Sequence, residues 1–476
     1  MEKHIAHILD LANSTGINAI EIVSLPPSGS PRKYFRILTD ESKSFIGVYH
    51  PHQKENIAHY RFTKHFKSKN LPVPEIYARS ADFKYFILQD LGDTTLLKYI
   101  EENRNKLNGD EIVSLFKRAV DDLLLFQTEG IKGLNLSYAF PVSQFDKRSI
   151  LWDLNYFKYS FVKTNEIETD ENRLEDDFET FASVLLGAKA EYFQYRDFQS
   201  RNIMIHDNRY WYIDFQGGRK GPLEYDLVSL IYQAKAGLTP DQRDELYSYY
   251  LKKLQTIEPG ATESFKKHYK YFVYFRLMQV LGAYGFRGLF QRKPHFLESI
   301  YPAISALEQQ LQRCEFPGNM PELRNILLKI KEIKERYRPV SNTNDILTVE
   351  INSFSYKKGG IPYDISPNGG GFVFDCRALP NPGRLPQLRD YTGKDKPVVE
   401  YLENFEEIAF YKKNVFGIVT QSINNYLKRG FSRLQVNFGC TGGKHRSVYM
   451  AEALRSYLSK KEGIRIVVNH KEQTQA

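Results

Sequence analysis

A short hairpin in the middle of this 476-residue chain constrains its fold more than any other sequence feature. Apolar residues at 203–205 and 211–213 predict its two strands, which flank a polar turn. Asp197 and Asn202 precede the first strand, and Asp214 follows the second. Because a hairpin returns the chain to the end where it started, we expect these three polar side chains to share one space.

These three side chains fit the chemistry of phosphoryl transfer. That reaction needs a carboxylate beside the attacking hydroxyl, and oxygen ligands that hold Mg²⁺ on a nucleoside triphosphate. We assign the catalytic role to Asp197 and the metal-binding role to Asn202 and Asp214, because Mg²⁺ prefers oxygen ligands. Asp and Asn are also common in turns, but a turn alone does not explain the spacing together with the hairpin. The predicted cofactors are Mg²⁺ and, as co-substrate, ATP.

The sequence around the three residues resembles a known family. The segments that carry the resemblance are 196–202, 213–216, 221–230 and 276–282. They are similar to the aminoglycoside phosphotransferase-like kinases, which share the protein kinase fold, and above all to the bacterial anomeric kinases of N-acetylmuramate and N-acetylglucosamine. The resemblance covers roughly residues 10–335. It implies a two-lobed α+β kinase with ATP in its cleft and a small-molecule sugar as acceptor.

The same resemblance suggests roles for other residues. Asp226 is expected to brace the catalytic loop rather than to contact the substrate. Gln199 stands where many relatives carry a histidine, and because both side chains are polar the change does not indicate inactivity. The segment 88–92 resembles the hinge between the lobes, where backbone groups of Gln89 and Leu91 would contact adenine. An ordinary strand end with a turn explains that segment almost as well.

The phosphate-binding part of the amino-terminal lobe departs from the family pattern. A turn at 26–31 with a single glycine separates two expected strands. The strand at 44–50 lacks the lysine that usually binds the α- and β-phosphates, so we expect Arg32, Lys33 or Arg36 to supply the missing charge. The predicted phosphate-contacting residues are Ser28, Gly29, Ser30, Arg32 and Lys33.

A second anion site is expected near the carboxyl end of the chain. The strand at 434–438 leads into a glycine-containing loop and then a helix, and backbone N–H groups at such a helix start bind anions. Lys444 and Arg446 add positive charge, but the longer Walker loop is absent. Cys440 lies six residues before Arg446, close to the spacing in phosphatases with a thiolate nucleophile. A binding loop without chemistry is the favoured interpretation.

This loop and the segments 374–382 and 391–398 resemble the carboxy-terminal domain of the RNase adapter protein RapZ. The resemblance covers about residues 346–472 and implies a small α/β domain that senses glucosamine-6-phosphate and, in some members, binds small RNA. The end of the chain has few cations, which argues against RNA as a partner. Oligomerisation through this domain remains open. The implied ligand-site residues are Asp375, Arg377, Asn381, Cys440, Thr441, Gly442, Gly443, His445, Arg446 and Ser447.

The polar stretch after Pro339 is the best candidate for a domain boundary. We therefore predict a kinase-like domain over residues 1–340, with a small lobe at about 1–92 and a large lobe at about 93–340. The small α/β domain, with its phosphate-binding strand–loop–helix, is predicted to occupy 346–476. A chain of this length exceeds what one core usually supports, which agrees with at least two domains.

Composition and charge agree with a protein that handles anionic ligands. The formal net charge is +9, which suits ATP and sugar phosphates, although so mild an excess carries little weight. The three cysteines, Cys314, Cys376 and Cys440, do not form a disulfide framework. No signal peptide is evident, and no apolar run approaches the roughly 18–20 residues that cross a bilayer. The predicted location is the cytoplasm, with no membrane partner.

The favoured prediction is an ATP-dependent sugar kinase. Its acceptor is a sugar hydroxyl, expected on an amino sugar of cell-wall recycling such as N-acetylmuramate or N-acetylglucosamine, and the second domain is expected to bind an amino-sugar phosphate. The alternative is a non-catalytic regulator, in which a degenerate kinase serves as scaffold for a ligand- or RNA-binding domain. The missing lysine favours this alternative, whereas the complete Asp–Asn–Asp set opposes it.

Overall fold

The computed structural model describes residues 2–26, 31–40, 43–313, 316–338, 346–362 and 371–473. These residues divide into two compact units, Met1–Phe286 with Ser299–Arg336, and Arg287–Glu298 with Tyr337–Ala476. The predicted boundary assigned the segment 287–298 to the first domain, whereas its contacts group it with the second unit. Each unit is described by itself below.

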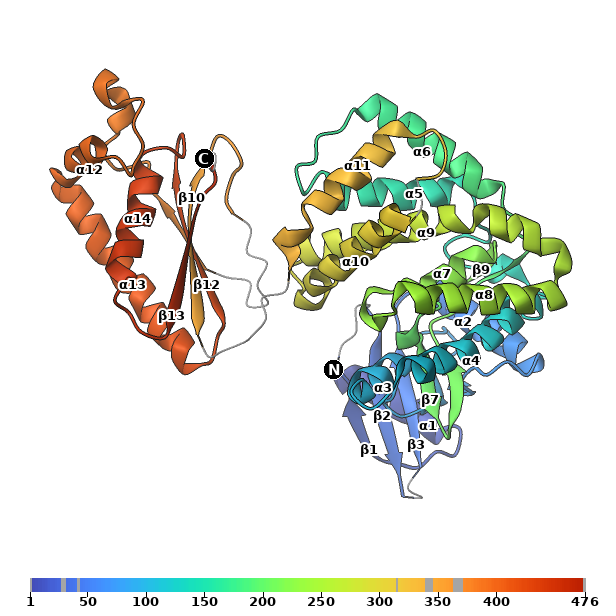
Figure 1. The fold of residues 1–476 in the computed structure, drawn as a ribbon. Coiled ribbons are helices and arrows are strands. Elements are labelled where there is room, and N and C mark those ends of the chain that lie inside the picture. The colour runs from blue at the N-terminus through green and yellow to red at the C-terminus, as the bar shows by residue number, and fades with distance from the viewer. Residues whose placement is uncertain are drawn as a thin grey trace. The chain divides into compact units, whose positions relative to one another are not determined.

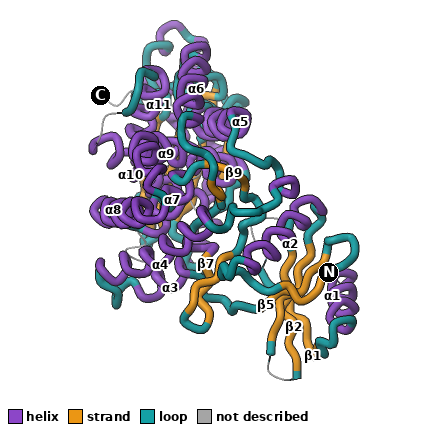
Figure 2. The backbone as a smooth tube through the Cα atoms, turned by 90° about the vertical axis from the view of Figure 1, so that its right-hand side faces the viewer, coloured by secondary structure: helices purple, strands orange, loops and turns teal. Residues whose placement is uncertain are grey.

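The first unit begins with a five-stranded antiparallel sheet in the order β1-β2-β3-β5-β4 (Figure 1). Its strands are β1 (Ala19–Ser24), β2 (Lys33–Thr39), β3 (Ser44–Tyr49), β4 (Ile76–Arg79) and β5 (Tyr85–Gln89). Figure 2 shows this sheet between helices α1 (Glu2–Asn13) and α2 (Gln53–Ser68). Ile8 of α1 is fully buried against the sheet, and a Cβ at Gly47 of β3 would lie only 2.7 Å from it. The close approach of α1 therefore depends on a glycine at that position.

Two short antiparallel ribbons follow the sheet in the chain and position the catalytic loop. The first pairs β6 (Tyr192–Gln194) with β9 (Arg219–Gly221). The second pairs β7 (Ile203–His206) with β8 (Arg209–Tyr212), so the hairpin predicted from the apolar pattern is confirmed. Its first pair joins Ile203 to Tyr212, which places Asn202 next to Ile213.

Helices build the rest of the first unit (Figure 1). An Asn108–Glu111 capping box begins α4, and Thr239 with Gln242 forms another at the start of α8. The shared core combines aliphatic side chains with aromatic rings from distant segments, such as Phe66 and Phe126. The helices are α3 (Leu96–Asn103), α4 (Gly109–Thr128), α5 (Lys147–Phe157), α6 (Glu171–Leu186), α7 (Glu224–Ile231), α8 (Pro240–Ile257), α9 (Thr262–Tyr284), α11 (Pro321–Glu332) and the part of α10 (Pro294–Arg313) from Ser299 onward.

The second unit is a four-stranded sheet in the order β11-β12-β10-β13, and its three strand pairings are all parallel. Its strands are β10 (Leu347–Ser355), β11 (Gly371–Asp375), β12 (Arg433–Cys440) and β13 (Ile464–His470). The helices are α12 (Lys396–Glu403), α13 (Glu406–Lys428) and α14 (Arg446–Leu458). Figure 1 shows α13 and α14 on the same face of the sheet, where they enclose the unit's own apolar core.

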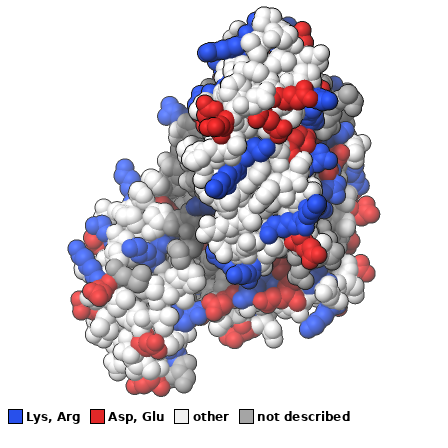
Figure 3. All heavy atoms as spheres, turned by 90° about the vertical axis from the view of Figure 1, so that its left-hand side faces the viewer, with Lys and Arg blue, Asp and Glu red and all other residues white. Residues whose placement is uncertain are grey.

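The surface gives two further observations. No helix among the described residues has the length and apolarity needed to cross a membrane. On the face drawn in Figure 3, basic and acidic side chains are interspersed among uncharged ones. The described residues of that face therefore do not form the broad basic surface that is typical of nucleic-acid-binding domains.

Candidate functional site

The hairpin brings the three predicted catalytic residues into one hydrogen-bonded group. The side-chain amide of Asn202 donates to the backbone oxygen of Asp197 at 2.8 Å. The same nitrogen lies 3.4 Å from Oδ2 of Asp214. The backbone N–H of Ile213 donates to the Asn202 carbonyl at 3.1 Å, which fixes the two segments side by side. The spatial arrangement expected from the sequence is therefore present.

The backbone around this group is held in an unusual conformation. Arg196 and Asp214 have φ angles of +77° and +69°, in the left-handed region that non-glycine residues rarely adopt. The carboxylate of Asp226 accepts hydrogen bonds from the N–H groups of Tyr195 at 2.6 Å and Arg196 at 2.8 Å. Burial raises the pKa of Asp226 to about 7, although the two N–H bonds act in the opposite direction. Asp226 braces the loop, as the sequence interpretation expected.

The donor set suits Mg²⁺. Burial and, after it, the neighbouring Asp197 carboxylate raise the pKa of Asp214, whose side chain nevertheless stays 41% exposed. A divalent cation would offset the repulsion between the two carboxylates. Because the amide nitrogen of Asn202 is used within the loop, its oxygen is oriented as an acceptor. Asn202 and Asp214 would hold the ion, and Mg²⁺ at such sites commonly takes its other ligands from phosphates and water.

A second charged group from the small lobe meets the same aspartate. The guanidinium of Arg32 donates to Oε1 of Glu55 at 2.7 Å and lies 3.8 Å from Oδ1 of Asp214. The side-chain amide of Gln216 donates to Asp214 at 2.7 Å and lies 3.3 Å from Glu55. Tyr34 adjoins this group: burial raises its pKa, and the charge of Arg32 opposes the rise. The turn before β2, helix α2 and the segment after β8 thus converge on Asp214.

Within its described ranges, the structure does not place the other predicted phosphate-contacting residues at Asp214. Ser28, Gly29 and Ser30 lie outside the described residues. Lys33 is exposed, and strand alternation places it on the same face of β2 as the buried Phe35, which packs in the core with α1. Its charge acts on His4 of α1, whose pKa is lowered first by burial and then by Lys33. The structure therefore does not bring Lys33 to Asp214.

Arg36 and the hinge residues form a group of their own. Arg36 donates to Asp90 at 2.7 Å and to Asp93 at 2.8 Å, and these bonds raise its pKa. The backbone N–H of Gln89, at the end of β5, donates to the carbonyl of Glu75, which immediately precedes β4, at 2.9 Å. Leu91 follows Asp90 and is 5% exposed. Arg36 thus stabilises the hinge segment that contains Gln89 and Leu91.

Sequence reasoning missed three residues of the Asp214 group: Tyr34, Glu55 and Gln216. Glu55 belongs to the first turn of α2, and Gln216 follows the Asp–Phe pair. The alternating pattern of β2 indicates that Tyr34 lies on the opposite face of the strand from Lys33. The pattern does not indicate which of the two faces α1 covers. These residues are distant in sequence, since 161 positions separate Gln216 from Glu55.

A partly buried polar network supports the catalytic loop. Arg196 is 3.8 Å from Asp153, which accepts a hydrogen bond from Gln279 at 2.7 Å. Arg276 donates to Gln279 at 2.5 Å and to the hydroxyl of Tyr225 at 3.1 Å. Burial raises the pKa of Asp153, and Arg196 is the largest influence in the opposite direction. The resembling segment at 276–282 therefore supports the loop that carries Asp197.

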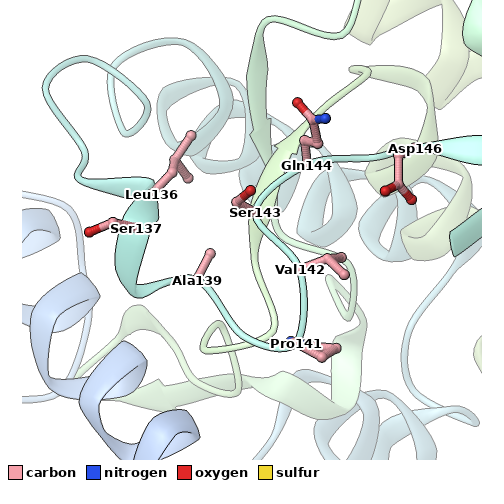
Figure 4. A pocket seen from close by; sticks show the side chains of 8 residues that line it. All are labelled: Leu136, Ser137, Ala139, Pro141, Val142, Ser143, Gln144 and Asp146. Atoms are coloured by element: carbon pink, nitrogen blue, oxygen red, sulfur yellow. The ribbon is translucent and has the colours of Figure 1, made fainter. Parts of the chain in front are cut away.

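The loop between α4 and α5 lines an open pocket of about 510 Å³ (Figure 4). The backbone of this loop is tied to β9, because the N–H of Lys220 donates to the Ser143 carbonyl at 2.9 Å. Since β9 pairs with β6, the pocket borders the ribbon that leads into the catalytic loop. Its lining residues are Leu136, Ser137, Ala139, Pro141, Val142, Ser143, Gln144 and Asp146.

In the second unit, the loop between β12 and α14 is compact. Cys440 is 3% exposed, its sulfur lies 3.1 Å from the Ser447 hydroxyl, and it accepts the N–H of Gly443 at 3.2 Å. Gly443 has a φ of +64°, and a Cβ there would lie 2.3 Å from the Glu472 side chain. A Cβ at Gly442, by contrast, would meet nothing within 4 Å. The loop therefore needs glycine at 443 and stays open at 442.

Arg446 ties this loop to the segment after β11. Its guanidinium donates to the carbonyls of Arg377 at 2.8 Å and Leu379 at 3.1 Å, and lies 3.4 Å from the Thr441 hydroxyl. Arg377 itself pairs with Asp375 at 2.7 Å on the surface. Because Arg446 is bonded to backbone carbonyls, its geometry resembles a structural clamp more than the phosphate clamp of a thiolate phosphatase.

His445 and Asn381 complete the predicted ligand-site residues. A ring nitrogen of His445 lies 3.2 Å from the Leu388 carbonyl, and burial lowers the pKa of the imidazole. Asn381 accepts a hydrogen bond from the N–H of Gly383 at 3.2 Å, and a Cβ at Gly383 would lie 3.3 Å from the His445 ring. The structure therefore groups the predicted residues around the start of α14.

Comparison with known families gives two matches along the chain. The model of the phosphotransferase enzyme family, APH, matches residues 21–263, just over half of the 476 residues. The model of the RapZ C-terminal domain matches residues 347–474. Together with the observed architecture, these matches confirm the predicted fold class.

Curated relatives share part of the chain. A nucleotide-binding protein of Psychrobacter sp. (strain PRwf-1) is 38% identical over 148 residues, which are 31% of this chain and 45% of that protein. A nucleotide-binding protein of Caldanaerobacter subterraneus subsp. tengcongensis is 40% identical over 151 residues, or 32% and 47% of the two chains. The chain spans about half the length of these curated relatives.

Two solved kinase structures align with this chain over nearly their whole length. Amicoumacin kinase hAmiN, in complex with AMP-PNP, Ca²⁺ and Ami, has a TM-score of 0.43 at 10% identity and covers 71% of this chain and 97% of its own. A choline/ethanolamine kinase family protein from Mesorhizobium loti has a TM-score of 0.41 at 13% identity, with coverages of 69% and 99%. On the strength of its family matches, the chain belongs to the phosphotransferase enzyme family and carries a RapZ C-terminal domain after its kinase-like part.

Proposed function

We propose that the first unit is an ATP- and Mg²⁺-dependent kinase that phosphorylates a sugar hydroxyl. The observation that carries this proposal is the hydrogen-bonded group of Asp197, Asn202 and Asp214. A base, an amide oxygen and a second carboxylate at one hairpin are what positioning and charge neutralisation of a triphosphate require. The match to the phosphotransferase family supports the same reaction class.

Each residue of the group has a distinct proposed role. Asp197 orients the acceptor hydroxyl and takes its proton while the hydroxyl oxygen bonds to the γ-phosphorus and ADP leaves. Asn202 and Asp214 hold Mg²⁺, which neutralises charge on the phosphates when it is bound. Asp226 keeps the loop in its left-handed conformation through two N–H bonds, so the position of Asp197 does not depend on the substrate.

The proposed acceptor is an amino sugar such as N-acetylmuramate or N-acetylglucosamine, as in cell-wall recycling. The resemblance of the segment 276–282 to the amino-sugar kinases supports this class. In the structure, Arg276 and Gln279 of that segment belong to the network behind Arg196. The sugar is proposed to approach Asp197 from the side of this network. Gln89 and Leu91 of the hinge are proposed to contact adenine.

For the second unit we propose binding of a phosphorylated amino sugar of the glucosamine-6-phosphate type. Backbone N–H groups at the start of α14 and the nearby Lys444 provide a site for a phosphate. The open space at Gly442 allows a ligand to approach the backbone. Cys440 is proposed to act in packing and hydrogen bonding rather than as a nucleophile, because it is 3% exposed.

A non-catalytic regulator is the competing function, and the absence of a lysine from β3 favours it. A coupled assay of ADP release with a panel of sugars and amino sugars separates the two functions. A kinase releases ADP only with Mg²⁺ and an accepted sugar, and EDTA abolishes the release. A regulator releases none with any sugar, and this outcome would contradict the proposed activity.

A further inference from the structure

The first unit contains a charge arrangement that answers the question of the missing lysine. Kinases of this fold hold the phosphates with a lysine on the third strand, and that lysine is paired with a glutamate on the following helix. Here β3 carries no lysine, yet the following helix α2 does carry a glutamate, Glu55, in its first turn. The partner of Glu55 is Arg32, which immediately precedes β2.

We propose that Arg32 is the cation that binds the α- or β-phosphate of the nucleotide, and that Glu55 and Gln216 position it. This inference rests on the proposed ATP-dependent function. It assigns the lysine's role to an arginine that reaches the same space from a different strand end.

The distances place Arg32 at the metal-binding aspartate. Its guanidinium is 2.7 Å from Glu55 and 3.8 Å from Asp214, and its side chain is only 11% exposed. A phosphate that shares a cation with Asp214 therefore lies within reach of the guanidinium. Arginine presents five N–H donors in a planar fork, a geometry that suits the recognition of phosphate oxygens beside a carboxylate anchor.

The anchor of Arg32 is itself supported from the large lobe. Gln216 donates to Asp214 at 2.7 Å and lies 3.3 Å from Glu55, so it joins the carboxylate that anchors Arg32 to the metal-binding aspartate. The residue before it, Phe215, stacks on His59 of α2 with ring centroids 5.3 Å apart. This contact packs helix α2 directly against the metal-binding segment, next to the Arg32–Glu55 pair.

The other two candidate cations are committed elsewhere. Arg36 bonds Asp90 and Asp93 at the hinge, and Lys33 lies on the α1 side of β2. Among the described residues, neither Arg36 nor Lys33 forms an ion pair with Glu55 or Asp214, whereas Arg32 forms one with each. The geometry selects Arg32 from the three cations that the sequence left open.

The test compares nucleotides that differ only in their phosphates. Arg32→Met removes the charge at similar length, Arg32→Lys keeps a charge, and Arg173→Met removes an arginine from a surface ion pair with Asp170 on α6 as the matched control. Binding of Mg·ATP, ADP and adenosine is measured by calorimetry on the full chain. A charge-assisted bond of about 1.5–3 kcal/mol corresponds to a loss of roughly 10- to 100-fold in affinity.

We expect Arg32→Met to weaken ATP and ADP by roughly 10- to 100-fold while adenosine binding changes less than about twofold. Arg32→Lys recovers part of the loss, and Arg173→Met binds all three as the wild type does. A structural role of Arg32 predicts equal losses for adenosine and ATP, and that result overturns the inference. Unchanged ATP affinity in Arg32→Met overturns it as well.

Glu55→Gln provides a second test if Arg32→Met does not fold. The variant keeps Arg32 but weakens its anchor, so the affinities for ATP and ADP should fall while the affinity for adenosine does not. Unchanged ATP affinity in Glu55→Gln contradicts the proposed roles of both Glu55 and Arg32. The proposed function fails separately: a wild-type protein that does not bind Mg·ATP refutes both claims. A wild-type protein that binds and uses ATP, together with an unaffected Arg32→Met variant, refutes only this one.

Discussion

Two buried acids of the first unit, Glu224 and Asp226, have different hydrogen-bonding environments although they are close in sequence. Glu224 and Asp226 lie two positions apart on α7 and are 2% and 0% exposed. Asp226 accepts two backbone N–H bonds from the catalytic loop. Burial raises the pKa of Glu224 to about 8, with only its own backbone N–H acting against the rise. Replacing each acid by its amide should therefore have different consequences for the protein.

Asp226→Asn should destabilise the first unit and lower kcat. An asparagine has only one acceptor oxygen, so its NH₂ group would face one of the two N–H donors at Tyr195 or Arg196. One unsatisfied buried donor costs about 1–3 kcal/mol. Thermal unfolding at pH 8 measures the loss of stability, and unchanged stability with unchanged kcat would contradict the bracing role.

Glu224→Gln should instead flatten the pH dependence of stability. The reference pKa of a glutamate is 4.5, and burial raises that of Glu224 to about 8, so between these values the folded state keeps a proton that the unfolded state has lost. The free energy of unfolding therefore falls as pH rises through this window, by about 1.4 kcal/mol per unit at most. Relative to wild type, the variant should gain stability from pH 5 to pH 8. Parallel pH curves for the two proteins would contradict the buried, protonated state of Glu224.

The sequence anticipated those parts of the site that are local. The hairpin, the Asp197–Asn202 loop and the bracing Asp226 all lie within one short stretch, where apolar runs and spacing carry the information. The pairing of Arg32 with Glu55 spans 23 positions and depends on how α2 packs on the sheet. Sequence spacing does not encode that packing, so the sequence left three cations as candidates, of which the structure pairs Arg32 with Glu55.

Helices pack closely in the first unit where a glycine allows it. Gly282 of α9 lies against α5, and a Cβ there would be 2.9 Å from the backbone of Phe157. Gly417 of α13 in the second unit is also inside a helix, but a Cβ there would meet nothing within 4 Å. The two glycines share their cost in helix propensity and differ only in packing.

Gly282→Ala should destabilise the first unit by about 1–3 kcal/mol through overpacking against α5. Gly417→Ala should stabilise the second unit by about 0.5–1 kcal/mol, because alanine favours the helix and meets open space. Calorimetric unfolding of both variants checks the signs. Equal shifts in the same direction would show that helix propensity, and not packing, governs both positions.

The chain as a whole joins two units with separate apolar cores. Among the described residues, the core cluster of the second unit shares no member with the clusters of the first unit that contain Phe66 and Ile8. A ligand that binds one folded unit should therefore raise the melting temperature of that unit alone. The Gly417→Ala variant identifies which calorimetric transition belongs to the second unit.

Mg·ATP should raise the melting temperature of the first unit, and glucosamine-6-phosphate should raise that of the second unit. At 100 times its dissociation constant, a ligand adds about 2.7 kcal/mol, which corresponds to a shift of several degrees. If glucosamine-6-phosphate raised the transition of the first unit instead, the proposed ligand site at the start of α14 would be wrong. A shift of both transitions by either ligand would instead reveal coupling between the units.

Phosphoryl transfer by an Asp197→Asn variant tests the central claim most directly. The control is Asp207→Asn, which changes an exposed aspartate in the turn of the same hairpin. With Mg·ATP and the best acceptor of the sugar panel, Asp197→Asn should lower kcat by roughly 10²–10⁴-fold while Mg·ATP affinity stays within about twofold. Asp207→Asn should turn over as the wild type does. Wild-type turnover by Asp197→Asn would contradict the assignment of Asp197 as the catalytic base.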